Sequence, residues 1–90
     1  MKQVEVVLTN EEGLHARPAS IFSKVAFKFK SDIKVYKNDN KEKVYNPKSI
    51  LSVLSMGAAK GDKLLITAEG EDEDLAVQEL KKLVEDKFGE

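Results

Sequence analysis

A proline at the start of a helical pattern is the feature that most constrains how this chain can fold. Apolar residues recur downstream of it at the spacing of one helix face, at Phe22, Val25, Ala26 and Phe29. This pattern predicts an amphipathic helix from about Ala16 to Phe29. Proline is tolerated in the first turn of a helix, where its missing N–H would have no intrahelical partner anyway. Pro18 therefore places the helix start beside His15, with Gly13 supplying a flexible approach.

His15 is the only histidine of the chain and the candidate reactive group at this helix start. A helix N-terminus presents unpaired N–H groups and roughly half a positive charge, which together favour a phosphate. The guanidinium of Arg17 adds donors whose geometry suits phosphate oxygens. An uncharged imidazole nitrogen is a nucleophile, so it could accept a phosphoryl group and surrender it again. The segment predicts a phosphoryl relay, although a lone histidine here also fits a plain surface or capping residue.

Three segments resemble the HPr family, the histidine-containing phosphocarriers of the bacterial sugar phosphotransferase system. Residues 13–20 (GLHARPAS) resemble the active-site signature, and residues 48–57 (KSILSVLSMG) resemble the regulatory serine segment. Residues 61–70 (GDKLLITAEG) resemble the last strand and turn. The segments occur in the order of the family, and the resemblance extends over nearly all of the chain. It implies an open-faced sandwich of four antiparallel strands in spatial order 1-4-2-3, with three helices on one face.

The resemblance also implies roles for the helix start. Enzyme I, charged from phosphoenolpyruvate, would pass a phosphoryl group to a ring nitrogen of His15, Nδ1 in the family, for delivery to enzyme IIA domains. Arg17 and the N–H groups of Ala16 and Arg17 would hold the phosphate, while Pro18 fixes the first turn. Such a protein is a carrier with a transient phosphohistidine rather than a free-standing catalyst, and it needs no cofactor or metal. Regulatory members that bind transcription factors or enzymes lack the histidine, so His15 argues against that alternative.

Ser49 is the predicted N-cap of a short helix. By resemblance to HPr proteins of the Gram-positive type, it is also a site for an ATP-dependent serine kinase and a matching phosphorylase. A catabolite-control transcription factor would then be a further partner. Pro47 and Ser52 depart from the common family pattern and bear on recognition by these regulatory partners rather than on the carrier role.

A docking surface is expected on the same short helix. The helical repeat places Ile50, Val53 and Leu54 on its inward side and turns Leu51 outward. In the family, this helix carries an exposed apolar patch that binds partners. The resemblance therefore makes Ser20, Ile50, Leu51 and Leu54 the docking candidates, with a plain core role for Ile50 and Leu54 as the alternative.

Alternating apolar and polar residues predict strands over residues 3–9, 32–37, 43–46 and 63–68. A last amphipathic helix is predicted from about Asp72 to Phe88, with acids in its first turn and lysines late. The order β-α-β-β-α-β-α indicates an α+β fold, a mostly antiparallel sheet covered by helices on one face. The polar turn over residues 38–42 is about three residues longer than in common HPr sequences, and a hairpin tip should tolerate the added length.

The bulk properties set the remaining limits. Ninety residues make one domain, residues 1–90, with no room for a second core. At 41% apolar and 34% charged residues, the composition is that of an ordinary globular protein. The absence of cysteine excludes disulfides, and one histidine excludes a multi-histidine metal centre. No signal peptide or membrane-spanning run is recognisable, so we expect a cytoplasmic monomer without stable membrane insertion.

The charges nearly cancel, at net −1, which argues against nucleic acid as the main partner. Their distribution is less even, because basic residues gather in or just after the first predicted helix, at Arg17, Lys24, Lys28 and Lys30. A basic rim around His15 would steer acidic partner proteins, whereas the same lysines also fit a solvated helix face. The acidic run at residues 69–74 is interpreted as a complement to the helix dipole rather than a metal site.

Overall fold

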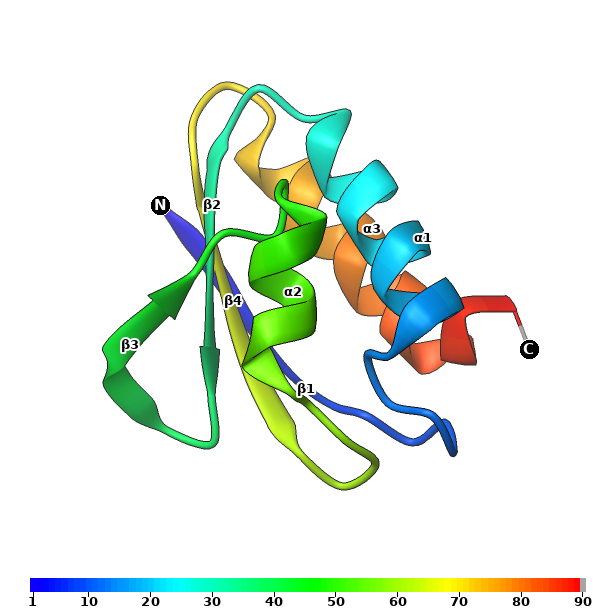
Figure 1. The fold of residues 1–90 in the computed structure, drawn as a ribbon. Helices are drawn as coiled ribbons and strands as arrows, with labels where there is room; N and C mark the ends of the chain where they lie inside the picture. Colours follow the sequence, from blue (N-terminus) through cyan, green and yellow to red (C-terminus); the bar gives the residue numbers. More distant parts are fainter. Residues whose placement is uncertain (90) are drawn as a thin grey trace.

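The computed structural model describes residues 1–89, and its elements follow the predicted order. They are β1 (Lys2–Val7), α1 (Ala16–Phe27), β2 (Asp32–Lys37), β3 (Asn40–Tyr45), α2 (Ile50–Met56), β4 (Lys63–Glu69), α3 (Glu73–Glu85) and a 3₁₀ turn (Lys87–Gly89). The strands form one antiparallel sheet in the order β1-β4-β2-β3, and the three helices lie on one side of it (Figure 1). The predicted fold class, with its strand order, is confirmed. None of the described helices has the length and apolar character needed to span a membrane.

The core lies between the sheet and the helices. Strand residues alternate as predicted, so that one face contributes the buried side chains Val6, Ile33, Val35, Leu64 and Ile66. The centre is aromatic, because the ring of Phe22 on α1 meets that of Phe88 edge to face, with centroids 6.4 Å apart. Each ring is at most 2% exposed. The helix face predicted from periodicity is thus the one that covers the sheet.

Both long helices end earlier than predicted. α1 ends at Phe27, yet Phe29 is only 6% exposed, because the chain beyond the helix still packs on the core. α3 ends at Glu85, and the chain then turns through positive φ values that include +58° at Phe88. This turn, rather than a continued helix, brings Phe88 onto the core. Helical periodicity therefore identified the buried side chains but not where the helices stop.

The hairpin between β2 and β3 has a tight two-residue turn. Asn38 and Asp39 both have positive φ, +51° and +65°, and Lys37 pairs with Asn40 on either side of them. Left-handed residues in this position match the twist of the flanking strands, and Asn and Asp adopt that conformation more readily than most residues. The hairpin is therefore closed by a two-residue turn, the commonest connection of this kind.

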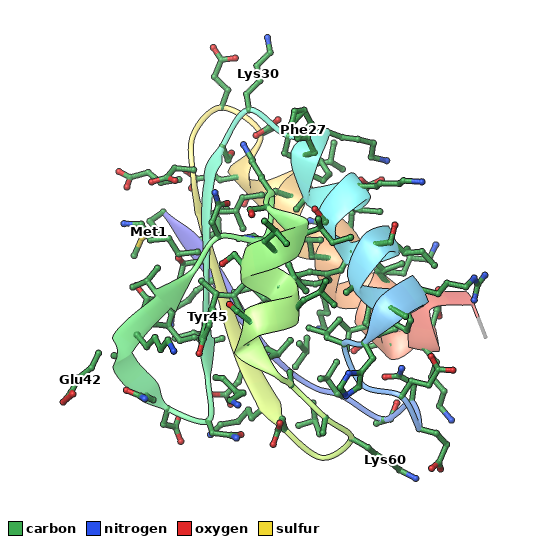
Figure 2. All side chains as sticks on the ribbon, in the orientation of Figure 1. Met1, Phe27, Lys30, Glu42, Tyr45 and Lys60 are labelled. Atoms are coloured by element: carbon green, nitrogen blue, oxygen red, sulfur yellow. The ribbon has the colours of Figure 1, made fainter. Side chains whose placement is uncertain are left out.

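The polar turn predicted over residues 38–42 is confined to Asn38 and Asp39, and the residues that follow belong to β3. From the pair Lys37–Asn40 to the pair Val35–Tyr45, the chain advances two residues along β2 but five along β3. The surplus bulges out of β3, where Glu42 points away from the molecule (Figure 2). Because β3 is an edge strand with a single neighbour, it can bulge without disturbing the sheet.

Two loops, side by side, continue the sheet toward the start of α1. We call residues 8–14 the approach loop and residues 57–62 the clamp loop. Leu8 N donates to the carbonyl of Asp62 at 3.0 Å, and Gly61 N donates to the carbonyl of Leu8 at 2.8 Å. These bonds extend the β1–β4 ladder by one step beyond its terminal pair, Val7 and Lys63.

The approach loop is also fixed at its far end, next to α1. Leu14 N donates to the carbonyl of Ala58 at 2.9 Å. Gly13 has φ +60° and lies so close to the clamp loop that a Cβ would fall 2.6 Å from Ala58 O and from Ala59 Cα. Glycine is therefore required at position 13 for its backbone conformation and for the close approach of the two chains.

The opposite end of α1 is held by charged side chains from two other elements. The ammonium of Lys48, just before α2, donates to the carbonyls of Phe29 and Ser31 at 2.7 and 2.8 Å. The carboxylate of Asp72 accepts from the backbone N–H groups of Lys30 and Ser31 at 2.8 and 2.9 Å and also from the Ser31 hydroxyl. Asp72 occupies the N-cap position of α3 without a side-chain capping bond among residues 1–89. Its carboxylate joins the beginning of α3 to the loop that follows α1.

We predict that Asp72 makes the free energy of unfolding depend on pH. Hydrogen bonds from the Ser31 hydroxyl and the Lys30 N–H lower the pKa of Asp72 from its usual value of 3.8. A carboxyl with a lowered pKa in the folded state adds stability above its unfolded pKa and loses it as pH falls through the folded one. The stability difference between the protein and Asp72→Asn should be largest at neutral pH and shrink as the pH falls below the usual value of 3.8 and through the lowered folded-state pKa.

Denaturant unfolding at several pH values measures this difference. Asp74→Asn is the matched control, because the exposed Asp74 carboxylate lies 3.4 Å from the Lys2 ammonium in a surface ion pair. Such pairs contribute little, so the control should show a small difference throughout the range. A difference for Asp72→Asn that does not vary with pH would contradict the assigned hydrogen bonds.

We predict that Gly13→Ala destabilises the protein more than Gly57→Ala. The two glycines have nearly equal φ values, +60° and +62°, so an added Cβ causes similar backbone strain, about 1–2 kcal/mol. At Gly57 no atom of residues 1–89 lies within 4 Å of the added Cβ, whereas at Gly13 the clamp loop would be displaced. The loss in unfolding free energy for Gly13→Ala should be larger by about 1–3 kcal/mol. Equal losses would disprove the close approach.

Candidate functional site

His15 is the N-cap residue of α1, but its side chain does not cap the helix. The backbone is extended there (φ −100°, ψ 163°), and the imidazole makes no capping hydrogen bond with residues 1–89. The carbonyl of His15 accepts from Ala19 N at 3.2 Å and so begins the helical hydrogen bonding. The side chain is exposed. The ring is thus available for chemistry at the helix start.

The backbone is strained directly after His15. Ala16, the first residue of α1, has a φ of +29°, which L residues rarely adopt. Strain of this kind costs roughly 1–3 kcal/mol and persists where neighbouring structure enforces it, often at functional sites. Here the Leu14–Ala58 hydrogen bond holds the chain before the strained residue, and the buried Pro18 holds it afterwards. The bend that presents His15 is therefore imposed by contacts on both sides.

Donors for an anion are present in this first turn without acceptors among residues 1–89. Pro18 has no N–H, and Ala19 N already donates to His15, which leaves the N–H groups of Ala16 and Arg17 without helical acceptors. Arg17 is exposed beside them. Two N–H groups, a guanidinium and the positive end of a helix dipole thus lie within one turn of the imidazole. This is the arrangement that the sequence predicted for holding a phosphate.

A surface ion pair joins the two loops next to the site. The Lys60 ammonium on the clamp loop lies 2.7 Å from the Glu11 carboxylate on the approach loop. This hydrogen bond and the charge of Lys60 lower the pKa of the Glu11 carboxyl below its usual value. Lys60 projects from the rim of the molecule (Figure 2), where solvent screens the pair. The pair adds a polar link to the two loops but little stability.

Ser49 is the N-cap of α2, as predicted. Its backbone is extended, and its hydroxyl oxygen accepts from Ser52 N at 3.3 Å. α1 and α2 run in opposite directions (Figure 1), so the end of α2 that meets the approach loop is the one followed by Ala58. A helix of seven residues is about 10 Å long. The structure therefore separates Ser49 from His15 by the length of α2.

The buried side of α2 differs from the prediction. Val53 is buried as expected, but its buried companion is Met56, and Ile50 and Leu54 are 41% and 42% exposed. Because Met56 packs inward, the buried side is rotated by nearly a quarter-turn away from Ile50 and further from Leu54. The prediction that these two residues face the core is wrong. Together with Leu51, which is 76% exposed, they form an apolar surface on α2, as the docking interpretation requires.

Sequence reasoning missed two residues near this surface. Phe27 is 69% exposed at the end of α1, where it points into solvent (Figure 2). Its position in the sequence could have indicated this exposure, because Phe27 directly follows Ala26 and so lies off the apolar face of α1. Lys48 attaches the start of α2 to the end of α1, and no sequence signal indicates a bond between side chain and backbone over such a separation.

Ser20, the predicted docking candidate on α1, is half-buried and lies one turn beyond Arg17.

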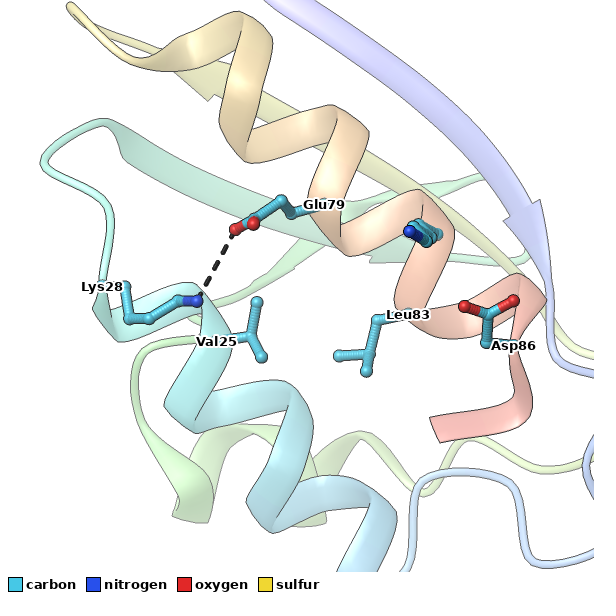
Figure 3. Close-up of a pocket in the computed structure, with 6 residues that line it drawn as sticks. Val25, Lys28, Glu79, Leu83 and Asp86 are labelled. Carbon is cyan, nitrogen blue, oxygen red and sulfur yellow. Dashed lines mark ion pairs between the residues drawn. The ribbon is translucent and has the colours of Figure 1, made fainter. Parts of the chain in front are cut away.

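A hollow of about 200 Å³ opens between α1 and α3 (Figure 3). Its apolar floor is Val25 and Leu83, and its rim carries two lysines and two acids, Lys28, Lys82, Glu79 and Asp86. Lys28 and Glu79 lie 3.7 Å apart across it. No residue of the helix start around His15 lines the hollow. It is therefore separate from the candidate phosphate site, and its charges nearly cancel.

Comparisons of the sequence and the fold with known proteins point to one family. A family model described as the PTS HPr component phosphorylation site matches residues 2–86. The chain is 41% identical over 86 residues to phosphocarrier protein HPr of Mycoplasma capricolum, which covers 96% of this chain and 93% of that protein. HPr-C-His from Thermoanaerobacter tengcongensis matches with a TM-score of 0.92 at 43% identity, over 100% of this chain and 98% of that one.

The structure of an HPr dimer from Thermoanaerobacter tengcongensis is also similar, with a TM-score of 0.76 at 46% identity over the whole of both chains. The match in sequence and the match in fold therefore extend over almost the entire length of this chain. The strand order and the three helices of this chain also match those of HPr structures. The chain belongs to the HPr family, the phosphocarrier proteins of the phosphotransferase system for sugar transport.

Proposed function

We propose that His15 is the phosphoryl acceptor of this carrier, charged by phospho-enzyme I and discharged to sugar-specific enzyme IIA domains. The observation that carries the proposal is an exposed imidazole at a helix start whose own N–H groups are unpaired. A ring nitrogen attacks phosphorus, the donor's bond to phosphorus breaks, and the donor keeps that electron pair. Transfer to enzyme IIA repeats this step, with the imidazole as the leaving group.

Arg17 and the N–H groups of Ala16 and Arg17 stabilise the phosphoryl oxygens in both directions. Transfer of this kind requires positioning and charge stabilisation more than covalent machinery. Pro18 contributes by fixing the first turn, so that the donors do not have to be ordered during the reaction. Because the phosphoryl group must leave again, the site holds it near the surface and does not enclose it.

The apolar surface of α2, with Ser20 on α1, serves as the docking site for both partners. Ile50, Leu51 and Leu54 expose large apolar side chains, a feature typical of protein–protein contacts. A carrier must offer the same face first to the donor and then to the acceptor. We therefore propose that it works as a monomer in the cytoplasm, because a lasting dimer through this face would block the exchange.

We predict that phosphoenolpyruvate and enzyme I add a single acid-labile phosphate to the protein and none to His15→Ala. The imidazole is the only nucleophile in the turn that holds the donors, so its removal abolishes carriage. The fold should survive, because the imidazole is exposed and makes no capping bond. Intact mass before and after mild acid measures the phosphate, and thermal unfolding measures the fold.

A known HPr, charged under the same conditions, is the positive control for enzyme I. Phosphate retained by a folded His15→Ala variant would place the acceptor elsewhere. If the protein takes up no phosphate while the control is charged, the chain would instead act as a regulatory HPr-like module that binds transcription factors or enzymes.

Ser49 is the proposed regulatory site, modified by a serine kinase and restored by a phosphorylase. Its position at a helix N-terminus tolerates a phosphate, so the fold should remain. The added charge, about −1.5 to −2, would lie beside the apolar docking surface and oppose acidic partners. Direct repulsion between a phosphate on Ser49 and one on His15 should be weak, because about the length of α2 separates the two residues and salt screens charges beyond about 8 Å.

We predict that Ser49→Asp raises the KM for phospho-enzyme I more than it lowers the maximal rate of phosphoryl transfer. Aspartate preserves the cap while adding a negative charge at the docking surface. Ser49→Ala is the matched control: it should lose about 0.5–2 kcal/mol of unfolding free energy but keep the wild-type KM. Steady-state transfer rates over a range of phospho-enzyme I concentrations separate the two effects. A lowered maximal rate with an unchanged KM would contradict a docking role.

A further inference from the structure

Asp62, the last residue of the clamp loop, forms hydrogen bonds within its own loop and with two other segments. Its carboxylate accepts from Ala59 N at 2.8 Å, within the same loop, and from Asn38 Nδ2 at 3.0 Å, at the tip of the hairpin. Its carbonyl accepts from Leu8 N on the approach loop at 3.0 Å, and its own N–H donates to the carbonyl of Ala59 at 2.9 Å. Asp62 thus holds the clamp loop in a closed turn and attaches it to the hairpin on one side and to the approach loop on the other.

The hairpin partner of Asp62 is itself fixed. Asn38 N donates to the carbonyl of Lys63 at 2.8 Å, and Lys63 N donates to Asn38 Oδ1 at 2.9 Å. Asn38 has a positive φ of +51° in the tight turn, so its side chain starts from a defined backbone position. Each oxygen of the Asp62 carboxylate therefore meets a donor that does not move freely. The hydrogen bonds that Asp62 accepts from Asn38 and from Ala59 N also lower the pKa of its carboxyl.

The path from this carboxylate to the reactive histidine is short. Asp62 holds Ala59, and the chain at Ala58 and Ala59 is the surface against which Gly13 packs. The next residue, Leu14, is bonded to the carbonyl of Ala58, and His15 follows it directly. A displaced clamp loop would therefore shift the imidazole relative to the N–H groups of the first turn of α1.

We propose that Asp62 is a positioning residue for phosphoryl transfer at His15, acting through the clamp loop, an inference that rests on the function proposed above. Asp62 itself touches neither the imidazole nor the donors of α1. Its carboxylate sets the shape of the clamp loop, and the clamp loop sets the place of the histidine. Removing one of its hydrogen bonds lowers the rate of transfer at saturating donor and leaves docking through α2 unchanged.

The chemistry of the pair Asp62 and Asn38 allows a sharp test. In Asp62→Asn, one amide oxygen replaces two carboxylate oxygens, so the introduced NH₂ faces a donor, either the N–H of Ala59 or the amide of Asn38. Combining it with Asn38→Asp restores every bond: the new amide oxygen accepts from Ala59, and the new NH₂ donates to the carboxylate at position 38. The exchange preserves net charge and size, and aspartate also tolerates the left-handed turn.

The experiment measures phosphorylation by phospho-enzyme I for the wild type, Asp62→Asn, Asn38→Asp and the double exchange. Asp62→Asn should lower the maximal rate about tenfold with KM unchanged, and the double exchange should return it to within about twofold of wild type. Amide chemical shifts of Leu14 and His15 should move in the single variant and return in the double one. Asp39→Asn is the control, since the exposed Asp39 pairs with Lys63 at 2.9 Å outside the clamp loop.

Two results would overturn the inference: a wild-type maximal rate in the folded Asp62→Asn variant, or a double exchange that regains stability but not rate. If Asp62→Asn does not fold, Asn38→Ala removes the Nδ2 donor that binds the Asp62 carboxylate and leaves the carboxylate in place, and its maximal rate decides the question in the same way. Failure of the proposed function is distinct, because the wild-type protein itself would then take up no phosphate.

Discussion

The hydrogen-bonded contact between the approach loop and the clamp loop is the constraint on which the site depends. It begins where the β1–β4 ladder ends, so the hydrogen bonding of the sheet continues to the residue before His15. A strained φ at Ala16 can persist because this ladder holds the chain on one side and buried Pro18 holds it on the other. The exposed His15 is thus positioned by main-chain hydrogen bonds on the residues before it, without being buried.

α1 is held at both ends by different chemistry. Backbone hydrogen bonds fix its start, whereas the Lys48 ammonium and the Asp72 carboxylate fix the loop after its end. Between these points, Phe22 packs against Phe88 in the core. A helix held in this way cannot slide along its axis, so the N–H groups of its first turn keep their place beside His15. The same Lys48 bond ties the beginning of α2, and with it the docking surface, to α1.

Local periodicity predicted the elements and their α+β class, because strand alternation and helical stripes record which side chains face the core, whereas the strand order was predicted only from the resemblance to the HPr family. The start of α1 beside His15 was also predictable, since Pro18 fixes a helix start to within a turn. What sequence could not supply was information from distant contacts. Met56 rotates the buried side of α2, a chain reversal returns Phe88 to the core, and the surplus length enters β3 instead of the turn. Bonds such as that of Asp62 to Asn38 join positions with no shared pattern.

The bulge in β3 also affects how molecules of this protein meet one another. β3 is one of the two outer strands, and a straight outer strand offers a row of unpaired N–H and C=O groups to which another chain can add. Here the surplus residues interrupt that row and bear three exposed charged side chains, Lys41, Glu42 and Lys43. A second sheet could pair with this border only by straightening the bulge and desolvating those charges. The extra residues of β3 therefore protect the protein against fibrous self-assembly at this edge of the sheet.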